Sequence, residues 1–487
     1  FEFTDMQGEK VYYGNYEFSR ECITNRDRMF DCPQNLREEE MFEVPEWAAN
    51  KVVYQIFPSR FAATEPVDKE LWYKAPITPM DDLHGNLRGI IEHMDDIQNL
   101  GIDVLYMTPI FQSNSCHKYD TTDYYQIDPS FGTTEDLKEL VQKAHERGMK
   151  VVLDAVYNHT GREFFAFADI LENGEKSKYR DWYFIDGFPL KSEWGEIPNF
   201  KCFGYYGGMP KLNLKNPEVE KYITDVACYW IKECDIDGWR LDVGDEISHF
   251  FWKNFRKAVK AVKKDMLIIG EIWHYAGDFL EGDEWDTVMN YPFYLNLIDL
   301  LADEKITVSQ FVQNLGYLKG RLHKNCYPLM WNLIDSHDTA RFLHLCNDNK
   351  KKQHLAAAFQ LLLPGMPMIY YGDEYAMPGA NDPDCRRGMY WDEEYQDKEM
   401  YEWYKRLIQV RKSHACIVEG ELAGSVTEDE EGTIVLIRKN GEETIAMIFN
   451  CSSSAKKFNE YTQKYNLLTE NTFDGNVEGF DAAVIVL

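Results

Sequence analysis

The stretch Ile236-Asp-Gly-Trp-Arg-Leu-Asp-Val-Gly-Asp-Glu246 decides the fold of this chain. It predicts a short buried strand, Gly238 to Leu241, that ends at the carboxylate Asp242. Side chains two residues apart in a strand point to the same face, so Arg240 and Asp242 project together. A neighbouring guanidinium favours the ionised carboxylate and limits its rotation. The stretch alone fits either a structural ion pair or an oriented nucleophile.

Three further apolar runs end in polar side chains, at Asn158-His159, at Glu271 and at His337-Asp338. Positions 242 and 271 are 29 residues apart, about one strand plus one helix, and 271 and 338 are 67 apart, about two such units. Polar groups at the carboxyl ends of successive parallel strands form the active site of a (β/α)₈ barrel. The spacing therefore predicts an α/β fold, a TIM barrel, with its site at these strand ends.

The barrel is predicted over residues 43–414, where eight apolar runs alternate with helical patterns. Asp154 and Asp242 are 88 residues apart, which is far more than one strand and helix need. We therefore expect an inserted subdomain over about 160–215, after the third strand. It is rich in Gly, Phe, Tyr and Trp and would overhang the site.

Both flanks of the barrel have strand patterns. Residues 1–42 alternate in polarity and are predicted to be the remnant of an N-terminal β-domain. Residues 415–487 are predicted to form a C-terminal antiparallel β-sandwich. In that domain Asn440-Gly441 indicates a hairpin with a type I′ turn.

Composition excludes several partners. The chain of 487 residues has 82 Asp plus Glu against 52 Lys plus Arg, a net charge of −30, which disfavours nucleic acids and anionic membranes. The sequence contains no apolar run of about 18 residues, so we expect no transmembrane helix. The 11 cysteines show no regular spacing, which favours a reduced, cytoplasmic setting, with an extracellular one as the alternative.

Carboxylates at neighbouring strand ends suit glycoside hydrolysis, in which a nucleophile and a protonated carboxyl stand about 5 Å apart. Asp242, beside Arg240, is the predicted low-pKa nucleophile. Glu271 follows an apolar run that excludes water, so its pKa should be raised, as a general acid requires. Asp338 would stabilise the distorted sugar ring, and His159 and His337 would donate hydrogen bonds to its hydroxyls.

Motifs for other reaction classes are absent. The sequence has no H-E-x-x-H, no G-x-S-x-G and no G-x-G-x-x-G after a strand. A zinc hydrolase, a serine hydrolase and a dinucleotide-dependent enzyme are therefore disfavoured.

The chain resembles the α-amylase family, glycoside hydrolase family 13, from about residue 45 to the end. The resemblance rests on Asp154-Ala-Val-Tyr-Asn-His159, Gly238-Trp-Arg-Leu-Asp242, Gly270-Glu271 and His337-Asp338. It implies the same three roles for Asp242, Glu271 and Asp338. Met209-Pro-Lys-Leu-Asn213 is similar to the motif of the neopullulanase, cyclomaltodextrinase and maltogenic amylase group.

The resemblance also implies five substrate-binding residues. Tyr119 would stack on the sugar at the cleavage site, and Asp382 and Arg386 would bind the next sugar on the non-reducing side. Trp273 and Phe203 would line the leaving-group side, although packing in the core of the subdomain explains Phe203 equally well. In this group the N-terminal domain supports a homodimer in the full-length protein.

Two stretches depart from the group's pattern. Gly244-Asp245-Glu246 replaces the usual Ala-Asn-Glu and adds a negative charge near the leaving-group side. The stretch Ser59 to Pro66 has few hard oxygen ligands, so we expect no cofactor, no metal and no calcium at the usual site.

The sequence thus predicts a retaining α-glucan hydrolase that acts on cyclodextrins, pullulan and maltooligosaccharides. It would cleave α-1,4 bonds, and α-1,6 bonds as an open alternative. The other hypotheses are a transglycosylase with the same chemistry and a catalytically silent glucan-binding scaffold. The scaffold is disfavoured because Asp242, Glu271 and Asp338 are all present.

Overall fold

The computed structural model describes residues 1–487 except 5–7, 16, 31–41 and 192–196. The chain forms two compact units, Phe1–Phe42 and Glu43–Leu487. In the first unit β1 (Glu2–Thr4), β2 (Lys10–Gly14) and β3 (Glu17–Ser19) form an antiparallel sheet. That this unit is the remnant of a larger domain stays a prediction.

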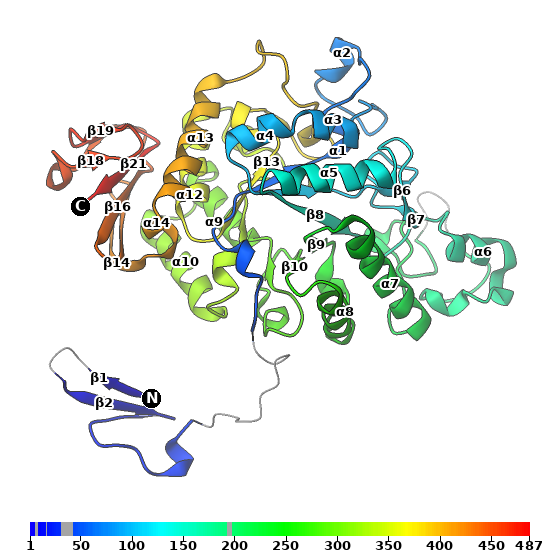
Figure 1. Ribbon diagram of the computed structural model, residues 1–487, viewed down its shortest axis with the longest axis horizontal. Helices are drawn as coiled ribbons and strands as arrows, with labels where there is room; N and C mark the ends of the chain where they lie inside the picture. The colour runs from blue at the N-terminus through cyan, green and yellow to red at the C-terminus, as the bar shows by residue number, and fades with distance from the viewer. Residues whose placement is uncertain (5–7, 16, 31–41, 192–196) are drawn as a thin grey trace. The chain divides into compact units, whose positions relative to one another are not determined.

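The second unit is built on eight parallel strands (Figure 1). In chain order they are β4 (Val53–Ile56), β5 (Val104–Met107), β8 (Lys150–Ala155), β9 (Gly238–Leu241), β10 (Leu267–Gly270), β11 (Thr287–Val288), β12 (Trp331–Asn332) and β13 (Met366–Tyr370). A parallel bridge between Met289 and Trp331 joins the two ends of the sheet. The predicted (β/α)₈ barrel is thereby confirmed.

Helices surround the barrel. The longer ones are α3 (Leu87–Glu92), α4 (Met94–Leu100), α5 (Thr134–Glu146), α7 (Pro217–Cys234), α8 (His249–Val262), α9 (Tyr291–Leu297), α10 (Val308–Arg321), α12 (Lys350–Leu362) and α13 (Lys398–Ser413). Local sequence sets their ends. Asn216 caps α7 and Pro217 occupies its first turn.

The inserted segment follows β8, the third barrel strand. It contains α6 (Phe165–Asn173); an isolated bridge from His159 to Lys211 ties it to the end of β8, and a bridge from Cys202 to Pro210 lies within the segment. A hairpin of β6 (Phe111–Ser113) and β7 (Thr121–Ile127) precedes β8 and carries Tyr119 in its turn. Both segments leave at the carboxyl end of the barrel.

The C-terminal part is antiparallel, as predicted. Its main sheet has the order β14 (Glu421–Glu428), β15 (Thr433–Asn440), β16 (Glu443–Asn450), β21 (Asp481–Val486), β18 (Tyr465–Asn466) and β19 (Asn471–Thr472), beside a pair of β17 (Lys456–Lys457) and β20 (Asn476–Val477).

The predicted type I′ turn is wrong. Asn440 pairs with Glu443, so Gly441 and Glu442 form the turn, and of these two only Gly441 has positive φ. This pattern is that of a type II′ turn, in which only the first central residue needs left-handed backbone.

No helix in the described part of the chain is long and apolar enough to span a membrane.

Candidate active site

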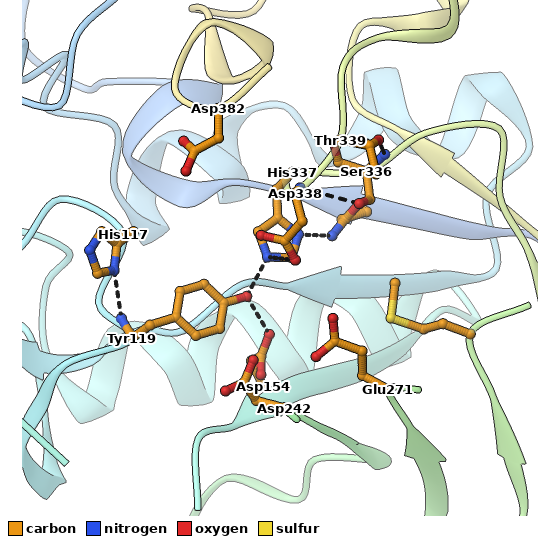
Figure 2. A network of polar contacts seen from close by, with 12 residues as sticks. His117, Tyr119, Asp154, Asp242, Glu271, Ser336, His337, Asp338, Thr339 and Asp382 are labelled. Atoms are coloured by element: carbon orange, nitrogen blue, oxygen red, sulfur yellow. Dashed lines mark hydrogen bonds and ion pairs between the residues drawn. The ribbon is translucent and has the colours of Figure 1, made fainter. Parts of the chain in front are cut away.

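Four carboxylates surround one arginine at the carboxyl end of the barrel. Arg240 Nη1 lies 3.0 Å from Asp154 Oδ1 and 2.9 Å from Asp242 Oδ1. Its Nη2 lies 2.9 Å from Glu271 Oε2 and 4.0 Å from Asp338 Oδ2. The guanidinium is fully buried. Figure 2 shows the four acidic side chains converging from different strand ends.

Asp242 contacts Nη1 of that guanidinium and Glu271 contacts Nη2. They follow the neighbouring strands β9 and β10, whose register pairs Leu241 with Gly270. One guanidinium group separates the two carboxyls, which is compatible with the spacing of about 5 Å in retaining glycosidases.

The two carboxyls differ in their hydrogen bonds. Glu271 accepts from Val243 N at 2.9 Å and from Trp273 Nε1 at 3.2 Å, and it forms an ion pair with Arg240 Nη2. Asp242 Oδ2 is buried and has no hydrogen-bond partner among the described residues. An oxygen without a donor keeps its lone pairs free, so Oδ2 is the atom that suits nucleophilic attack.

The prediction of a low pKa for Asp242 is wrong for this geometry. Burial raises the pKa of Asp242 well above its usual range, and the Arg240 charge only partly offsets it. Burial also raises the pKa of Glu271, as predicted. Sequence reasoning counted the arginine beside Asp242 but not the three further carboxylates that share it. One cation shared among four acids raises the proton affinity of the cluster as a whole, and general acid catalysis needs the proton on Glu271 while Asp242 is ionised.

Tyr119 and His337 form one side of the site. The Tyr119 hydroxyl donates to Asp154 Oδ2 at 3.0 Å and contacts His337 Nε2, and the two rings are parallel at 5.5 Å. Gln55 Nε2 donates to His337 Nδ1 at 2.7 Å, which leaves the His337 proton on Nε2, 3.1 Å from Asp338 Oδ2. Burial lowers the pKa of His337 well below its usual value, so the ring is neutral.

His159 differs from the prediction. Burial lowers its pKa to about 4, so the ring is neutral and carries one proton. Its Nε2 lies 3.1 Å from the Tyr119 carbonyl oxygen, which can only accept. The single donor is therefore used inside the protein, and His159 does not offer a donor to a sugar in this arrangement. Its ring instead stacks on the half-buried Phe203 at 5.2 Å.

Asp382 and Arg386 lie together on the other side of Asp338. Arg386 contacts Asp382 at 2.8 Å and Asp338 at 3.3 Å, and its Nε donates to the His337 carbonyl at 2.8 Å. Arg386 is buried, whereas the Asp382 side chain is half exposed. The pair is placed to bind hydroxyls beyond Asp338.

Trp273 lies beside Glu271 with 43% of its surface exposed, and it stacks on Tyr291 at 4.1 Å. Near it, the Asp245 carboxylate lies 3.2 Å from His274 Nε2, and Lys211 lies 2.7 Å from Glu246. The charge that Asp245 adds is thus next to a partner that can neutralise it.

Several residues of the site were missed by sequence reasoning. Tyr106 donates to Asp154 at 2.6 Å, Gln55 fixes His337, and Tyr291 supports Trp273. Gln55 and Tyr106 lie inside apolar runs and resemble core residues.

Within the described ranges, no group of three or more His, Cys, Asp or Glu side chains is placed to hold a metal ion. That the usual calcium site is missing stays a prediction.

A (β/α)₈ barrel with carboxylates at its strand ends around one buried arginine defines the class of barrel glycoside hydrolases. The family model described as the α-amylase catalytic domain matches residues 55–396. The chain belongs to the α-amylase family, glycoside hydrolase family 13.

Curated relatives are similar over most of the chain. A cyclomaltodextrinase of Geobacillus thermopakistaniensis (strain MAS1) is 45% identical over 452 residues, 92% of this chain and 76% of the relative. Neopullulanase 2 of Thermoactinomyces vulgaris is 42% identical over 92% of this chain and 77% of its own length. An intracellular maltogenic amylase of Bacillus subtilis is 42% identical over 85% of this chain and 71% of its own length.

Solved structures agree. A cyclomaltodextrinase superposes with a TM-score of 0.91 at 38% identity and covers 98% of this chain and 85% of its own. A cyclic α-maltosyl-(1→6)-maltose hydrolase from Arthrobacter globiformis, in complex with that sugar, superposes with a TM-score of 0.83 at 35% identity. The match covers 91% of this chain and 100% of the hydrolase.

Proposed function

We propose that this protein is a retaining hydrolase of α-glucans that cleaves α-1,4 and also α-1,6 glucosidic bonds in cyclodextrins, pullulan and maltooligosaccharides. One observation carries the proposal: Asp242 and Glu271 contact the two nitrogens of Arg240 at 2.9 Å each, from the ends of adjacent strands. The names of the relatives, cyclomaltodextrinase and neopullulanase 2, support the substrate class.

In the first step Asp242 Oδ2 attacks the anomeric carbon while the glycosidic bond breaks. Glu271 gives its proton to the leaving oxygen, which departs with the bond's electron pair. In the second step Glu271 removes a proton from water, the water oxygen attacks the anomeric carbon, and Asp242 is released. Two inversions at one carbon give net retention.

The neighbouring groups stabilise the positive charge that develops on the sugar ring. Asp338 is 30% exposed and lies across the site from Asp242, where it can accept from two hydroxyls. His337 holds Asp338 through its Nε2 proton, and Arg386 holds it from the other side. Tyr119 supplies a flat ring for the same sugar, fixed by its hydrogen bond to Asp154.

The binding residues divide the site into two sides. Asp382 and Arg386 bind the sugar on the non-reducing side, and Trp273 with Phe203 binds the leaving group. Calcium and other cofactors are not required for these steps. The name of the intracellular maltogenic amylase supports an intracellular location, and we propose a homodimer for the full-length protein.

An assay panel of cyclodextrin, pullulan and soluble starch tests the proposal. We expect cyclodextrin and short oligosaccharides to be cleaved fastest, with pullulan next. Replacement Glu271→Gln should abolish turnover of all three. Unchanged turnover in that variant would exclude the assignment. Products longer than the substrate would instead reveal transfer to a sugar acceptor.

A further inference from the structure

A second cavity, of about 400 Å³, lies outside the catalytic cluster. Its walls come from the segment 62–73, which follows β4 and contains α2 (Lys69–Trp72), and from Trp391 and Asp392 in the segment after β13. Strands β4 and β13 are neighbours in the barrel. Both segments leave their strands at the carboxyl ends, and Asp242 also follows the carboxyl end of its strand, so this cavity, the β4–β13 cavity, lies at the same end of the barrel as Asp242.

Aromatic rings in fixed orientations line the cavity. The Trp391 indole donates to the Phe61 carbonyl, and its ring stacks on His93 at 3.6 Å. Trp72 Nε1 donates to the Met389 carbonyl at 2.8 Å. Trp72 is 7% exposed and forms the floor of the cavity, whereas Trp391 is half-buried. Because the indole N–H of Trp391 is used inside the protein, its ring presents only apolar surface to a ligand.

Tyr73 adds a third ring. It stacks on Tyr395 at 4.0 Å, and its hydroxyl accepts from Asp392 N at 3.0 Å. The ring is half-buried and is held from its face and from its hydroxyl. Rings held in this way lose little entropy when a flat ligand packs on them.

The lysine on the cavity wall is already paired. Lys69 Nζ lies 2.7 Å from Asp392 and also contacts Glu394, and this pairing raises the pKa of Lys69. The net charge of −30 repels anions from the molecule as a whole. A neutral ligand with hydroxyl groups and apolar faces therefore fits best, and Thr64 and Glu65 on the wall can bind hydroxyls.

We propose that the β4–β13 cavity is a non-catalytic binding site for a short segment of an α-glucan chain. Its volume is within the range of about 300–1,000 Å³ that is usual for ligand sites. The inference rests on the proposed function for the identity of the sugar. Because both sites lie at the carboxyl end of the barrel, a chain long enough to span them would occupy both, which raises its effective concentration, whereas a short substrate cannot.

Two replacements separate this site from the catalytic one. Ala63→Trp fills the cavity, and Tyr73→Ala removes a ring of its wall. In each variant we expect kcat/KM for soluble starch to fall by roughly threefold or more, because the gain from double occupancy is lost. The value for 4-nitrophenyl maltoside should stay within about twofold of the parent, since a short substrate reaches only the catalytic site. The matched control is Phe165→Ala, which removes an exposed ring in the inserted segment, away from the β4–β13 cavity. It should leave kcat/KM for starch and for the maltoside unchanged.

Retention on insoluble starch in the Glu271→Gln background gives a readout without turnover. We expect Glu271→Gln with Ala63→Trp to bind less starch than Glu271→Gln alone. Equal retention, together with unchanged starch kinetics in Ala63→Trp, would overturn the proposal even if Tyr73→Ala fails to fold. A parent protein that cleaves no glucan would instead refute the proposed function.

Discussion

Arg240 holds Asp154 and Asp242 through one nitrogen and Glu271 through the other. Its planar, forked guanidinium can bind several carboxylates at once, which the single ammonium group of lysine cannot do. The guanidinium therefore sets the positions of both reacting carboxyls as well as the charge of the site.

Replacement Arg240→Lys keeps the charge but loses this geometry. We expect kcat/KM for maltotriose to fall by roughly 10²–10³, comparable to losing one preorganised electrostatic group. Steady-state kinetics measure this, with circular dichroism as the check on folding. A well-folded variant with near-parental kcat/KM would show that the arginine does not position the acids.

The raised pKa of Glu271 predicts the pH dependence. A general acid works only while it is protonated, so kcat/KM should decline as the pH rises through its pKa. Because burial raises that pKa, the protonated range extends to higher pH than for an ordinary glutamate. The pH profile for maltotriose tests this.

Glu271→Gln checks the origin of that decline. A fluoride leaving group needs no proton, so in the first turnover the variant should still release fluoride from α-maltosyl fluoride while it fails on maltotriose. Fluoride release should also no longer fall at high pH. Equal loss on both substrates would contradict the general-acid role.

At the scale of elements, two buried acids join the strand ends of β12 and β13. Arg341 Nη1 lies 2.9 Å from Asp373 Oδ1, and Phe342 N donates to Asp335 Oδ2 at 2.7 Å. Asp335 Oδ1 and Asp373 Oδ2 are buried without a donor among the described residues. Burial raises the pKa of both carboxyls and each lies next to the other, from which we infer that the pair shares one proton.

This shared proton predicts that Asp373→Asn is tolerated and Asp373→Ala is not. The amide can donate where the proton stood, whereas alanine leaves Arg341 buried without its partner, at a cost of about 3–5 kcal/mol. The folded state binds more protons than the unfolded one, so this pair loses stability as the pH rises through the folded pKa. Thermal unfolding at several pH values should show that Asp373→Asn removes this loss. An asparagine variant as unstable as the alanine variant would contradict the shared proton.

Arg411 joins α13 to the turn between α12 and β13. It is fully buried and donates to the carbonyls of Leu361 at 2.7 Å, Leu363 at 3.0 Å and Gly365. Arg411→Met leaves these acceptors unsatisfied, and we expect a loss of at least about 2 kcal/mol in the free energy of unfolding. Urea denaturation measures this, and Arg406→Met, which removes a surface ion pair with Glu470, is the control. Equally small losses of unfolding free energy in Arg411→Met and Arg406→Met would show that the buried contacts contribute little.

The strand pattern was predictable, and the catalytic acids were predictable with it. Asp242 and Glu271 each follow directly on a buried run of four residues, and this local signal survives in the fold. Gln55 and Tyr106 lie inside such runs, so only the closed barrel reveals that they face the site. The pKa of Asp242 depends on acids from three other strands, which no local stretch contains.

At the scale of the whole catalytic unit, the C-terminal sheet packs on helices of the barrel. Phe449 of β16 is fully buried and stacks on Phe359 of α12 at 4.3 Å. Ser309 of α10 contacts Thr427 of β14 at 2.8 Å. The sheet therefore covers apolar surface of the barrel.

Loss of this contact should destabilise the barrel without changing its chemistry. For Phe449→Ala we expect a cost of about 3–5 kcal/mol in the free energy of unfolding. The kcat/KM at 25 °C should remain near the parental value, because the site lies at the strand ends of the barrel. Calorimetry and steady-state kinetics on one preparation test both statements. Loss of kcat/KM in a fully folded sample would show that the sheet also shapes the site.

The double displacement through Asp242 is tested most directly by trapping its covalent intermediate. A 5-fluoro glucosyl fluoride forms the ester quickly and hydrolyses slowly, so the labelled peptide can be identified by mass spectrometry. We predict one sugar adduct, on Asp242. An adduct on another carboxylate, or turnover with no adduct and inverted product, would contradict the mechanism.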